Sequence, residues 1–221
     1  MNKDRSNKTR ALKLLEGAYN LKTPADNISY YKNFSGYYDE VFATALNYNY
    51  PKGIANEFLK NYDNEGLICD IGCGTGLVTQ ELKNLNNDLL IDGFDISAEM
   101  IKVAKDKKIY RNLYEIDLTK PIDNVPNNYS GIISAGVFTH GHLGPEVIKK
   151  LLSICLDGAI LTIGINAAYY ENKKFEDFII NLESSAEIKE INKIKIPIYA
   201  DSNNLEKKVN NMAIICSFIK N

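Results

Sequence analysis

The sequence predicts an α/β fold in which a doubly wound, mostly parallel sheet follows an N-terminal helical cap. Two observations predict it. From Leu67 onward, apolar runs of strand length alternate with amphipathic stretches of helix length. The first run, Leu67–Asp70, passes through glycines 72, 74 and 76 into a helix-like stretch, Leu77–Leu82. This order predicts a nucleotide cradle, because glycines allow a tight turn and a helix N-terminus offers free N–H groups.

Length and composition set the class of protein. The 221 residues suit one domain with an appendage, and 45% hydrophobic with 24% charged residues is ordinary for a globular chain. A net charge of −2 argues against a nucleic-acid surface. No apolar run approaches the roughly 20 residues that cross a bilayer, and the polar N-terminus has no signal-peptide core. We therefore expect no nucleic-acid partner and no membrane association.

The four cysteines, Cys69, Cys73, Cys155 and Cys216, form no CxxC pair and no cluster with histidine. Isolated cysteines in apolar segments are typical of buried thiols in a reducing compartment. We expect a cytoplasmic location, no disulfide and no metal site.

The residues before the sheet divide into a polar tail, 1–22, with a short helix around Ala11–Tyr19, and a helical cap, 23–62. Thr23 and Pro24 are a helix-start signal. Steps of three and four residues predict Tyr31, Phe34 and Tyr38 on one helix face. This stripe is either a packing face or a lid whose tyrosines close over a ligand. A second cap helix is expected over 52–62, after Pro51.

Residues 63–221 form the predicted main domain. Its strands are expected at 67–70, 89–95, 113–116, 131–135 and 159–165, with helices at 77–82, 98–109, from Gly144 onward, and at 174–182. The segments 188–199 and 212–219 complete seven strands with an antiparallel finish.

Acidic residues fall where three predicted strands end, at Asp70, Asp95 and Asp117. Ligands of open α/β sheets bind at the carboxyl ends of the strands. Asp95 lies about 20 residues after Gly76, the spacing at which an acid accepts both ribose hydroxyls, which disfavours NADP. Judged by Asp95 alone, NAD remains a possible ligand. Leu77 after Gly76 makes the loop GxGxG instead of GxGxxG, and Asp117 is placed to accept an adenine amino group; both count against NAD.

The order and spacing of these segments resemble a known motif series. Asp70–Gly76, Asp95–Ser97 and Asp117–Leu118 resemble the motifs of class I S-adenosylmethionine-dependent methyltransferases over about residues 63–165, which implies a Rossmann-like fold. Tyr30–Asp39 and Gly136–Pro145 are similar to bacterial relatives of the Williams–Beuren region methyltransferase-like family. The chain departs from the pattern at 156–159, where Leu-Asp-Gly-Ala replaces a usual Pro-Gly-Gly, and at Phe34, often tryptophan.

The resemblance implies a cofactor site for S-adenosylmethionine with defined roles. The glycine loop would pass against the methionine moiety, the acids and carbonyls would hold the ammonium, ribose and adenine, and the lid tyrosines would cover the cofactor. The residues are Gly72, Gly74 and Gly76 in the loop; Asp70, Ser134 and Ala135 toward the ammonium; Asp95 at the ribose; Ile96, Met100, Asp117 and Leu118 at the adenine; and Tyr31 and Tyr38 in the lid.

The only histidines, His140 and His142, fall in the loop after the fourth strand, where class I methyltransferases place groups on the acceptor side. Histidine titrates near neutrality and is able to deprotonate an acceptor. Methyl transfer also proceeds by alignment alone, because the sulfonium is already activated. Two roles stay open for these histidines, catalytic base and structural loop residue. His140 is favoured as the base because it is nearer the strand end.

Together these features predict a methyltransferase acting on a small molecule by in-line displacement. A DNA amino-methyltransferase is disfavoured, since its [DNS]PP[YFW] motif is absent and the corresponding stretch is Ser134–Val137. A cytosine C5 enzyme needs a Pro-Cys nucleophile, which this chain lacks. The alternatives kept are a nicotinamide-dependent oxidoreductase and a non-catalytic protein that binds S-adenosylmethionine.

Overall fold

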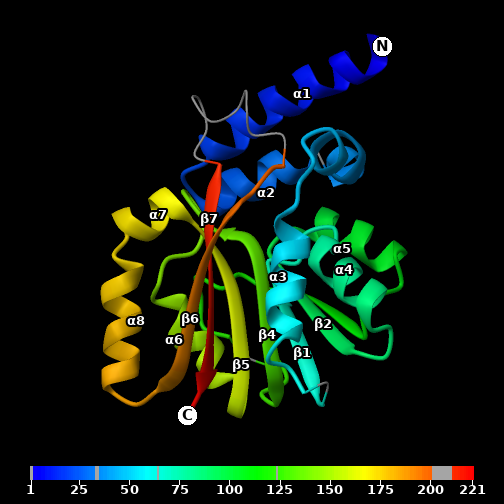
Figure 1. Cartoon of the computed structure of the whole chain (residues 1–221). Coiled ribbons are helices and arrows are strands. Elements are labelled where there is room, and N and C mark those ends of the chain that lie inside the picture. The colour runs from blue at the N-terminus through cyan, green and yellow to red at the C-terminus, as the bar shows by residue number, and fades with distance from the viewer. Residues whose placement is uncertain (1, 33–34, 64, 123, 201–210) are drawn as a thin grey trace.

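A computed structural model describes residues 2–32, 35–63, 65–122, 124–200 and 211–221 and confirms the predicted Rossmann-like sheet (Figure 1). Its seven strands have the order β3-β2-β1-β4-β5-β7-β6. The strands are β1 (Leu67–Ile71), β2 (Leu90–Asp95), β3 (Asn112–Glu115), β4 (Tyr129–Phe138), β5 (Cys155–Asn166), β6 (Ile188–Pro197) and β7 (Met212–Lys220).

The strands on one side of the sheet are parallel, and the two at its other edge are antiparallel to their neighbours. The strands from β3 to β5 are parallel, and β7 inserts antiparallel between β5 and β6. Every residue of β1 is buried, as expected for a central parallel strand covered on both faces. The order of the parallel strands reverses between β1 and β4, which makes that junction the topological switch point.

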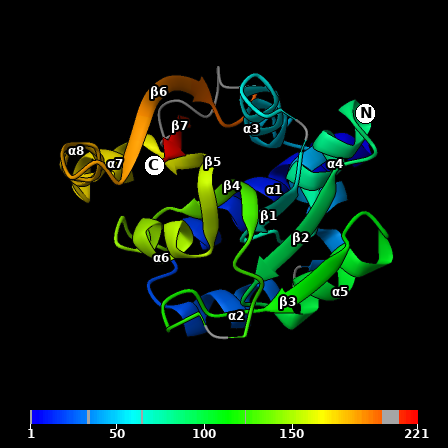
Figure 2. The same cartoon turned by 90° about the horizontal axis from the view of Figure 1, so that it is seen from below.

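Helices cover both faces of the sheet (Figure 2). One core cluster joins the sheet to α3 (Tyr50–Leu59) and α4 (Leu77–Leu85), and the other joins it to α6 (Val147–Ser153) and α8 (Phe175–Ser184). Helix α5 (Ala98–Asp106) packs beside β2 and β3. A short helix that was not predicted, α7 (Ala167–Asn172), begins where the Asn166 side chain accepts a hydrogen bond from the N–H of Tyr169.

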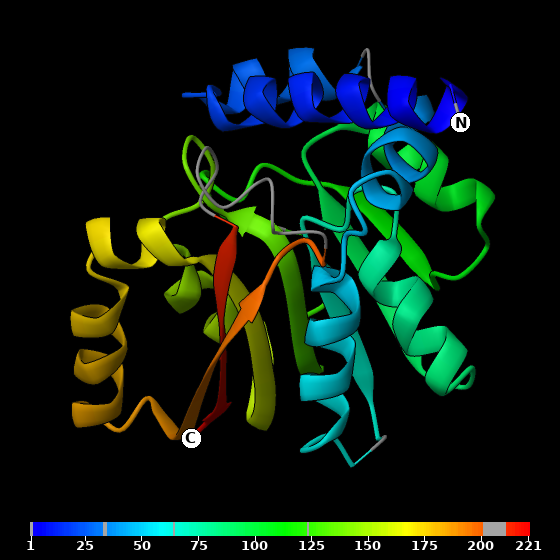
Figure 3. The same cartoon turned by 45° about the horizontal axis from the view of Figure 1, so that its top comes forward.

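Two N-terminal helices, α1 (Asn2–Tyr19) and α2 (Pro24–Lys32), lie across the carboxyl ends of the parallel strands (Figure 3). Helix α1 is longer than the predicted Ala11–Tyr19 because its polar first half carries no apolar period for the sequence to show. Ala11 is fully buried, and Gly17 allows close approach of Tyr30, whose hydroxyl donates to the carbonyl of Leu14. No helix in the described part of the chain is long and apolar enough to cross a bilayer.

The prediction of a single helix face for Tyr31, Phe34 and Tyr38 is wrong. Helix α2 ends at Lys32, and a 3₁₀ turn, η1 (Ser35–Tyr37), and a π-helix, η2 (Tyr38–Thr44), follow. Gly36 is a poor helix former, in keeping with a break here. Phe34 lies outside the described residues, whereas the rings of Tyr31 and Tyr38 still meet, with centroids 6.2 Å apart.

The strand expected at 159–165 begins earlier than predicted, because β5 already starts at Cys155. Tyr129 pairs with Cys155, and the register then shifts so that Gly131 pairs with Ile160. The Leu-Asp-Gly stretch is taken up in this irregularity, and Gly158 there has a φ of +81°.

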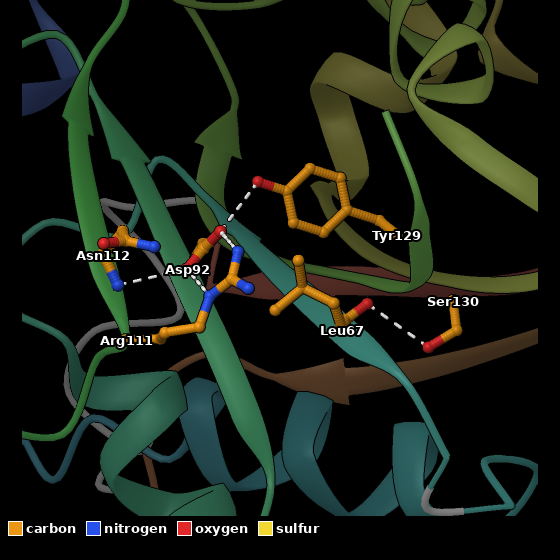
Figure 4. Close-up of polar contacts among 6 residues, drawn as sticks. All are labelled: Leu67, Asp92, Arg111, Asn112, Tyr129 and Ser130. Carbon is orange, nitrogen blue, oxygen red and sulfur yellow. Dashed lines mark hydrogen bonds and ion pairs between the residues drawn. The ribbon is translucent and has the colours of Figure 1, made fainter. Parts of the chain in front are cut away.

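A buried ion pair fixes the other end of the sheet (Figure 4). The Asp92 carboxylate on β2 accepts from Arg111 Nε at 2.9 Å and Nη2 at 2.7 Å, from the Asn112 N–H at 3.1 Å and from the Tyr129 hydroxyl at 3.1 Å. Asp92 is completely buried. Its contacts tie β3 and β4 to β2 at the end of the sheet opposite the N-terminal helices.

We predict that Arg111→Met lowers the free energy of unfolding by about 2 kcal/mol at pH 7. The substitution leaves a buried carboxylate without its counter-ion, and the cost lies toward the low end because Arg111 is 40% exposed. Urea unfolding of Arg111→Met, Asp92→Asn and the double variant measures the coupling between the two residues. The double variant should recover part of the loss; strictly additive losses would contradict an interaction between the two side chains.

Candidate active site

A cleft opens at the switch point between β1 and β4, under the N-terminal helices. It encloses about 1020 Å³ of empty space, part of which is open solvent. Most of the predicted cofactor residues meet on its walls, although they come from segments far apart in the sequence. These are Tyr31, Tyr38, Gly72, Gly74, Asp95, Ile96, Met100, Asp117, Leu118 and Ala135.

The glycine loop after β1 forms the floor of this cleft. Gly72, Gly74 and Gly76 have φ values of +63°, +54° and +91°, a region that side chains disfavour. A Cβ at Gly72 would press on Val137 at 2.8 Å, whereas one at Gly74 would meet nothing within 4 Å. Gly74 therefore presents bare backbone to the cleft, and the loop is held to β2 by the hydrogen bond from the Cys73 N–H to the Phe94 carbonyl.

Asp95, at the end of β2, is tied to this loop. Its Oδ2 accepts from the Gly74 N–H and its Oδ1 from the Ser97 N–H, each at 2.8 Å. Burial raises the pKa of the Asp95 carboxyl, against these N–H contacts, which lower it. A carboxylate has about four acceptor positions, so Asp95 can brace the loop and still accept from hydroxyl groups in the cleft.

The wall after β3 carries the second acid. Asp117 Oδ1 accepts from the N–H and the hydroxyl of Thr119, at 3.0 and 2.6 Å, and Oδ2 pairs with Lys120 at 3.2 Å. Burial acts to raise the pKa of Asp117, but the contacts with Thr119 and Lys120 outweigh it and hold the pKa below its usual value. Asp117 is therefore ionised at neutral pH.

Three predicted cofactor residues, Asp70, Gly76 and Ser134, do not line the cleft. Asp70 lies behind the loop, where its Oδ2 accepts from Thr79 at 2.8 Å and from Tyr110 at 2.7 Å. The Ser134 hydroxyl donates to the carbonyl of Ile71, at the end of β1, at 2.8 Å. Burial raises the pKa of Asp70 to about 6. Asp70 and Ser134 thus brace the loop from beneath.

The cap closes the cleft from above and is fastened to the loop. Asp39 Oδ1, on η2, accepts from the buried Thr75 hydroxyl at 2.6 Å, and its Oδ2 pairs with Lys107. Gly141 allows the loop after β4 to approach the chain between α1 and α2, since a Cβ there would lie 2.1 Å from the carbonyl oxygen of Leu21. These contacts place Tyr31 and Tyr38 over the cleft.

The two histidines diverge. His142 lines the cleft, and its ring lies 6.5 Å from that of Tyr31. His140, which the sequence favoured, lines neither this cleft nor the cavity beside it and packs against Tyr169, with centroids 5.1 Å apart. Burial lowers the pKa of His142 to about 4, so its imidazole is neutral at pH 7.

Sequence reasoning missed several lining residues, among them Tyr48, Pro51, Thr75 and Val137. Thr75 lies within the predicted loop, and its position was the available signal. Tyr48 had none, because it reaches the site through a backbone bridge to Tyr199, far along the chain.

The charge of the cleft is one-sided. Its walls carry Asp95 and Asp117, and no lysine or arginine is among the described lining residues. Nor do the described residues offer three or more His, Cys, Asp or Glu side chains grouped to hold a metal ion. Such walls favour a ligand with hydroxyl donors and positive charge over one with a pyrophosphate.

Comparison with known proteins identifies the segment around this cleft. Residues 68–157 match a family described as a methyltransferase domain. The human Methyltransferase-like protein 27 is 26% identical over 141 residues, 62% of this chain and 57% of that protein. The Malonyl-[acyl-carrier protein] O-methyltransferase of Bacillus anthracis is 31% identical over 122 residues, 51% of this chain and 45% of that protein. The chain thus spans about half the length of these two relatives.

Among solved structures, the plantazolicin methyltransferase BpumL, in complex with a monoazolic desmethylPZN analog and SAH, has a TM-score of 0.60 at 15% identity, over 98% of this chain and 99% of that one. This likeness shows a shared fold. Residues 68–157 are thus similar to a methyltransferase domain, which agrees with the class that the sequence predicts.

Proposed function

We propose that the chain is an S-adenosylmethionine-dependent methyltransferase acting on a small-molecule acceptor. The observation that carries the proposal is the cleft at the switch point, floored by bare glycine backbone and walled by two carboxylates without a described basic side chain. Membership of the Williams–Beuren region subfamily stays a prediction from Tyr30–Asp39 and Gly136–Pro145. A cytoplasmic location likewise stays a prediction, supported by four buried free cysteines.

The described residues fit the cofactor. Asp95 would accept the ribose hydroxyls while it holds the Gly74 N–H, and the Ile96 and Met100 side chains would flank the adenine beside Asp117 and Leu118. The backbone at Gly72, Gly74 and Ala135 would face the methionine end. Asp70, Gly76 and Ser134 would act as positioning residues, because they support the loop without reaching the cleft.

When bound, S-adenosylmethionine would supply an activated methyl group on a sulfonium, whose leaving group would be a neutral thioether. The chain's part is alignment and exclusion of water. Tyr31 and Tyr38 cover the cleft, and the Asp39 contacts with Thr75 and Lys107 keep that cover closed over the loop. A neutral His142 with so low a pKa is a weak base, so we assign it to orienting the acceptor by hydrogen bonding.

Two other functions stay open to test. A nicotinamide-dependent oxidoreductase would have to place a pyrophosphate in a cleft with two carboxylates and no described basic side chain. A non-catalytic protein would bind S-adenosylmethionine without transferring its methyl group. Comparing the binding of NAD and S-adenosylhomocysteine distinguishes the oxidoreductase from the methyltransferase. A screen for methyl transfer to cell metabolites distinguishes the non-catalytic protein from the methyltransferase.

We predict that Asp95→Ala weakens S-adenosylhomocysteine binding by about 10- to 100-fold, because two hydrogen bonds to a charged acceptor are lost. Asp95→Asn keeps an acceptor oxygen and should lose less. Isothermal calorimetry on the full chain measures both, with NAD as a second ligand and circular dichroism to verify folding. Asp157→Ala, at an exposed carboxylate on β5, is the matched control. Tight NAD binding without S-adenosylhomocysteine binding would reject the proposal.

We predict that His142→Phe makes stability less sensitive to acid. The pKa of His142 is lower in the folded chain than the usual value near 6.5, so the unfolded chain takes up the proton first, and folding stability falls as pH drops from about 6.5 toward 4. Between pH 7 and 5 the wild type should lose about 2 kcal/mol more than His142→Phe.

Urea unfolding at both pH values measures this difference. Comparison with the variant is needed because Asp70 acts in the opposite direction: its raised pKa makes stability increase as pH falls through about 6. Equal losses in the two proteins would mean that His142 titrates normally in the folded chain.

A further inference from the structure

A second cavity adjoins the cofactor cleft. It encloses about 520 Å³ of empty space, again partly open, and shares with the cleft a wall made of Tyr31, Tyr38, Tyr48, Gly136 and His142. Its remaining walls come from α1, the start of α3, the ends of β4 and β5 and the segment after β6. It therefore adjoins the cleft on the side of the loop after β4, which carries His142.

Aromatic rings form most of its wall, and backbone contacts fix some of them in place. The ring of Tyr48 lies 5.5 Å from that of Tyr199 and 6.1 Å from that of Tyr50. Tyr48 and Tyr199 are joined by an isolated β-bridge, and the buried Asn211 side chain binds both the N–H and the carbonyl of Tyr199. Rings held in this way offer flat apolar surfaces at little cost in conformational entropy.

The second cavity differs from the cleft in charge. Asp95 and Asp117 line the cleft, whereas none of the described residues around the second cavity is aspartate, glutamate, lysine or arginine. The cavity also contains His142, a residue type whose usual pKa is near neutrality; burial lowers its pKa to about 4, so the imidazole is neutral at pH 7. A carboxylate, a phosphate or an ammonium placed here would lose its hydration without gaining a counter-ion.

A polar residue on the wall of this cavity also points to a ligand. Thr139 lines the cavity, and its hydroxyl oxygen, which is buried, has no hydrogen-bond partner among the described residues. A buried hydroxyl left without a partner costs roughly 1–3 kcal/mol, so such groups are rare unless something else completes them. A hydroxyl or carbonyl group on a bound molecule would complete it.

We propose that this second cavity is the acceptor subsite and that it takes an uncharged molecule with a planar ring, which stacks on the tyrosine walls and exchanges a hydrogen bond with Thr139. The inference rests on the proposed methyltransferase function, because that function supplies the reason for an acceptor beside the cleft. It goes further in naming the chemistry of the acceptor and the residue that recognises its polar group.

The test compares probes that share one ring and differ in charge. The full chain, saturated with S-adenosylhomocysteine at pH 7, is titrated with p-cresol, 4-hydroxybenzoate, tyramine and toluene, and binding is followed by ligand-observed NMR. We expect p-cresol to bind at least about tenfold more tightly than the anionic or the cationic probe. Equal or tighter binding of 4-hydroxybenzoate or tyramine, or no binding of any ring, would overturn the inference.

Thr139→Val tests the hydrogen bond, with Thr139→Ser as the conservative control. Thr139→Val should remove most of the preference for p-cresol over toluene, and Thr139→Ser should keep it. An unchanged preference in Thr139→Val would overturn the role of Thr139.

S-adenosylhomocysteine affinity, measured on the same proteins, distinguishes a failure of the proposed function from a failure of the proposed acceptor class. Its absence in the wild type would reject the proposed function, whereas intact affinity with failed ring binding would reject the acceptor class alone.

Discussion

The site depends on one constraint: the backbone after β1 has to turn upward at the switch point in a space that side chains would fill. Val137 closes on Gly72 from β4, and Tyr110 closes on Gly76 from the segment before β3. The strand pairing sets these distances, so the turn cannot move away from its neighbours. Residues that hold the loop, from Asp95 above to Asp70 below, act on a path that packing has already fixed.

This constraint explains why one carboxylate, Asp95, can serve structure and ligand at once. It receives the Gly74 N–H because the left-handed backbone at Gly74 turns that group toward β2. Burial opposes its charge, as it does for Asp70, and neither carboxylate forms an ion pair with a described lysine or arginine. Asp95 shares the cleft wall with Asp117, and two carboxylates there without a described lining lysine or arginine favour a cation, which agrees with the proposed sulfonium cofactor better than with a dinucleotide.

The sequence predicted the fold, and most of the residues that it assigned to the cofactor line one cleft, because both depend on local order. Glycine spacing, acids at strand ends and alternating apolar runs are readable within a few residues of each other. The second cavity was not readable from the sequence. Tyr48 meets Tyr199 through a single backbone bridge, and Thr139 shares the cavity wall with Asn166 and Tyr199, which lie far from it along the chain. The positions of the two histidines were not readable for a related reason: distance from the strand end says nothing about which way a loop residue turns, and His142 lines the cleft whereas His140 packs against Tyr169.

The tyrosines of the cap take up different positions, although the sequence predicts one stripe for Tyr31 and Tyr38. On an unbroken helix, Tyr31 and Tyr38 would face one direction and serve one purpose. The chain instead ends α2 at Lys32 and restarts as a π-helix at Tyr38, so the two rings reach the shared wall from different elements. Tyr30, one residue earlier, turns the other way and bonds to the carbonyl of Leu14 in α1. Tyr30 thus fastens the cap together, whereas Tyr31 and Tyr38 form part of the wall between the two cavities, and Asp39 fastens the cap to the glycine loop.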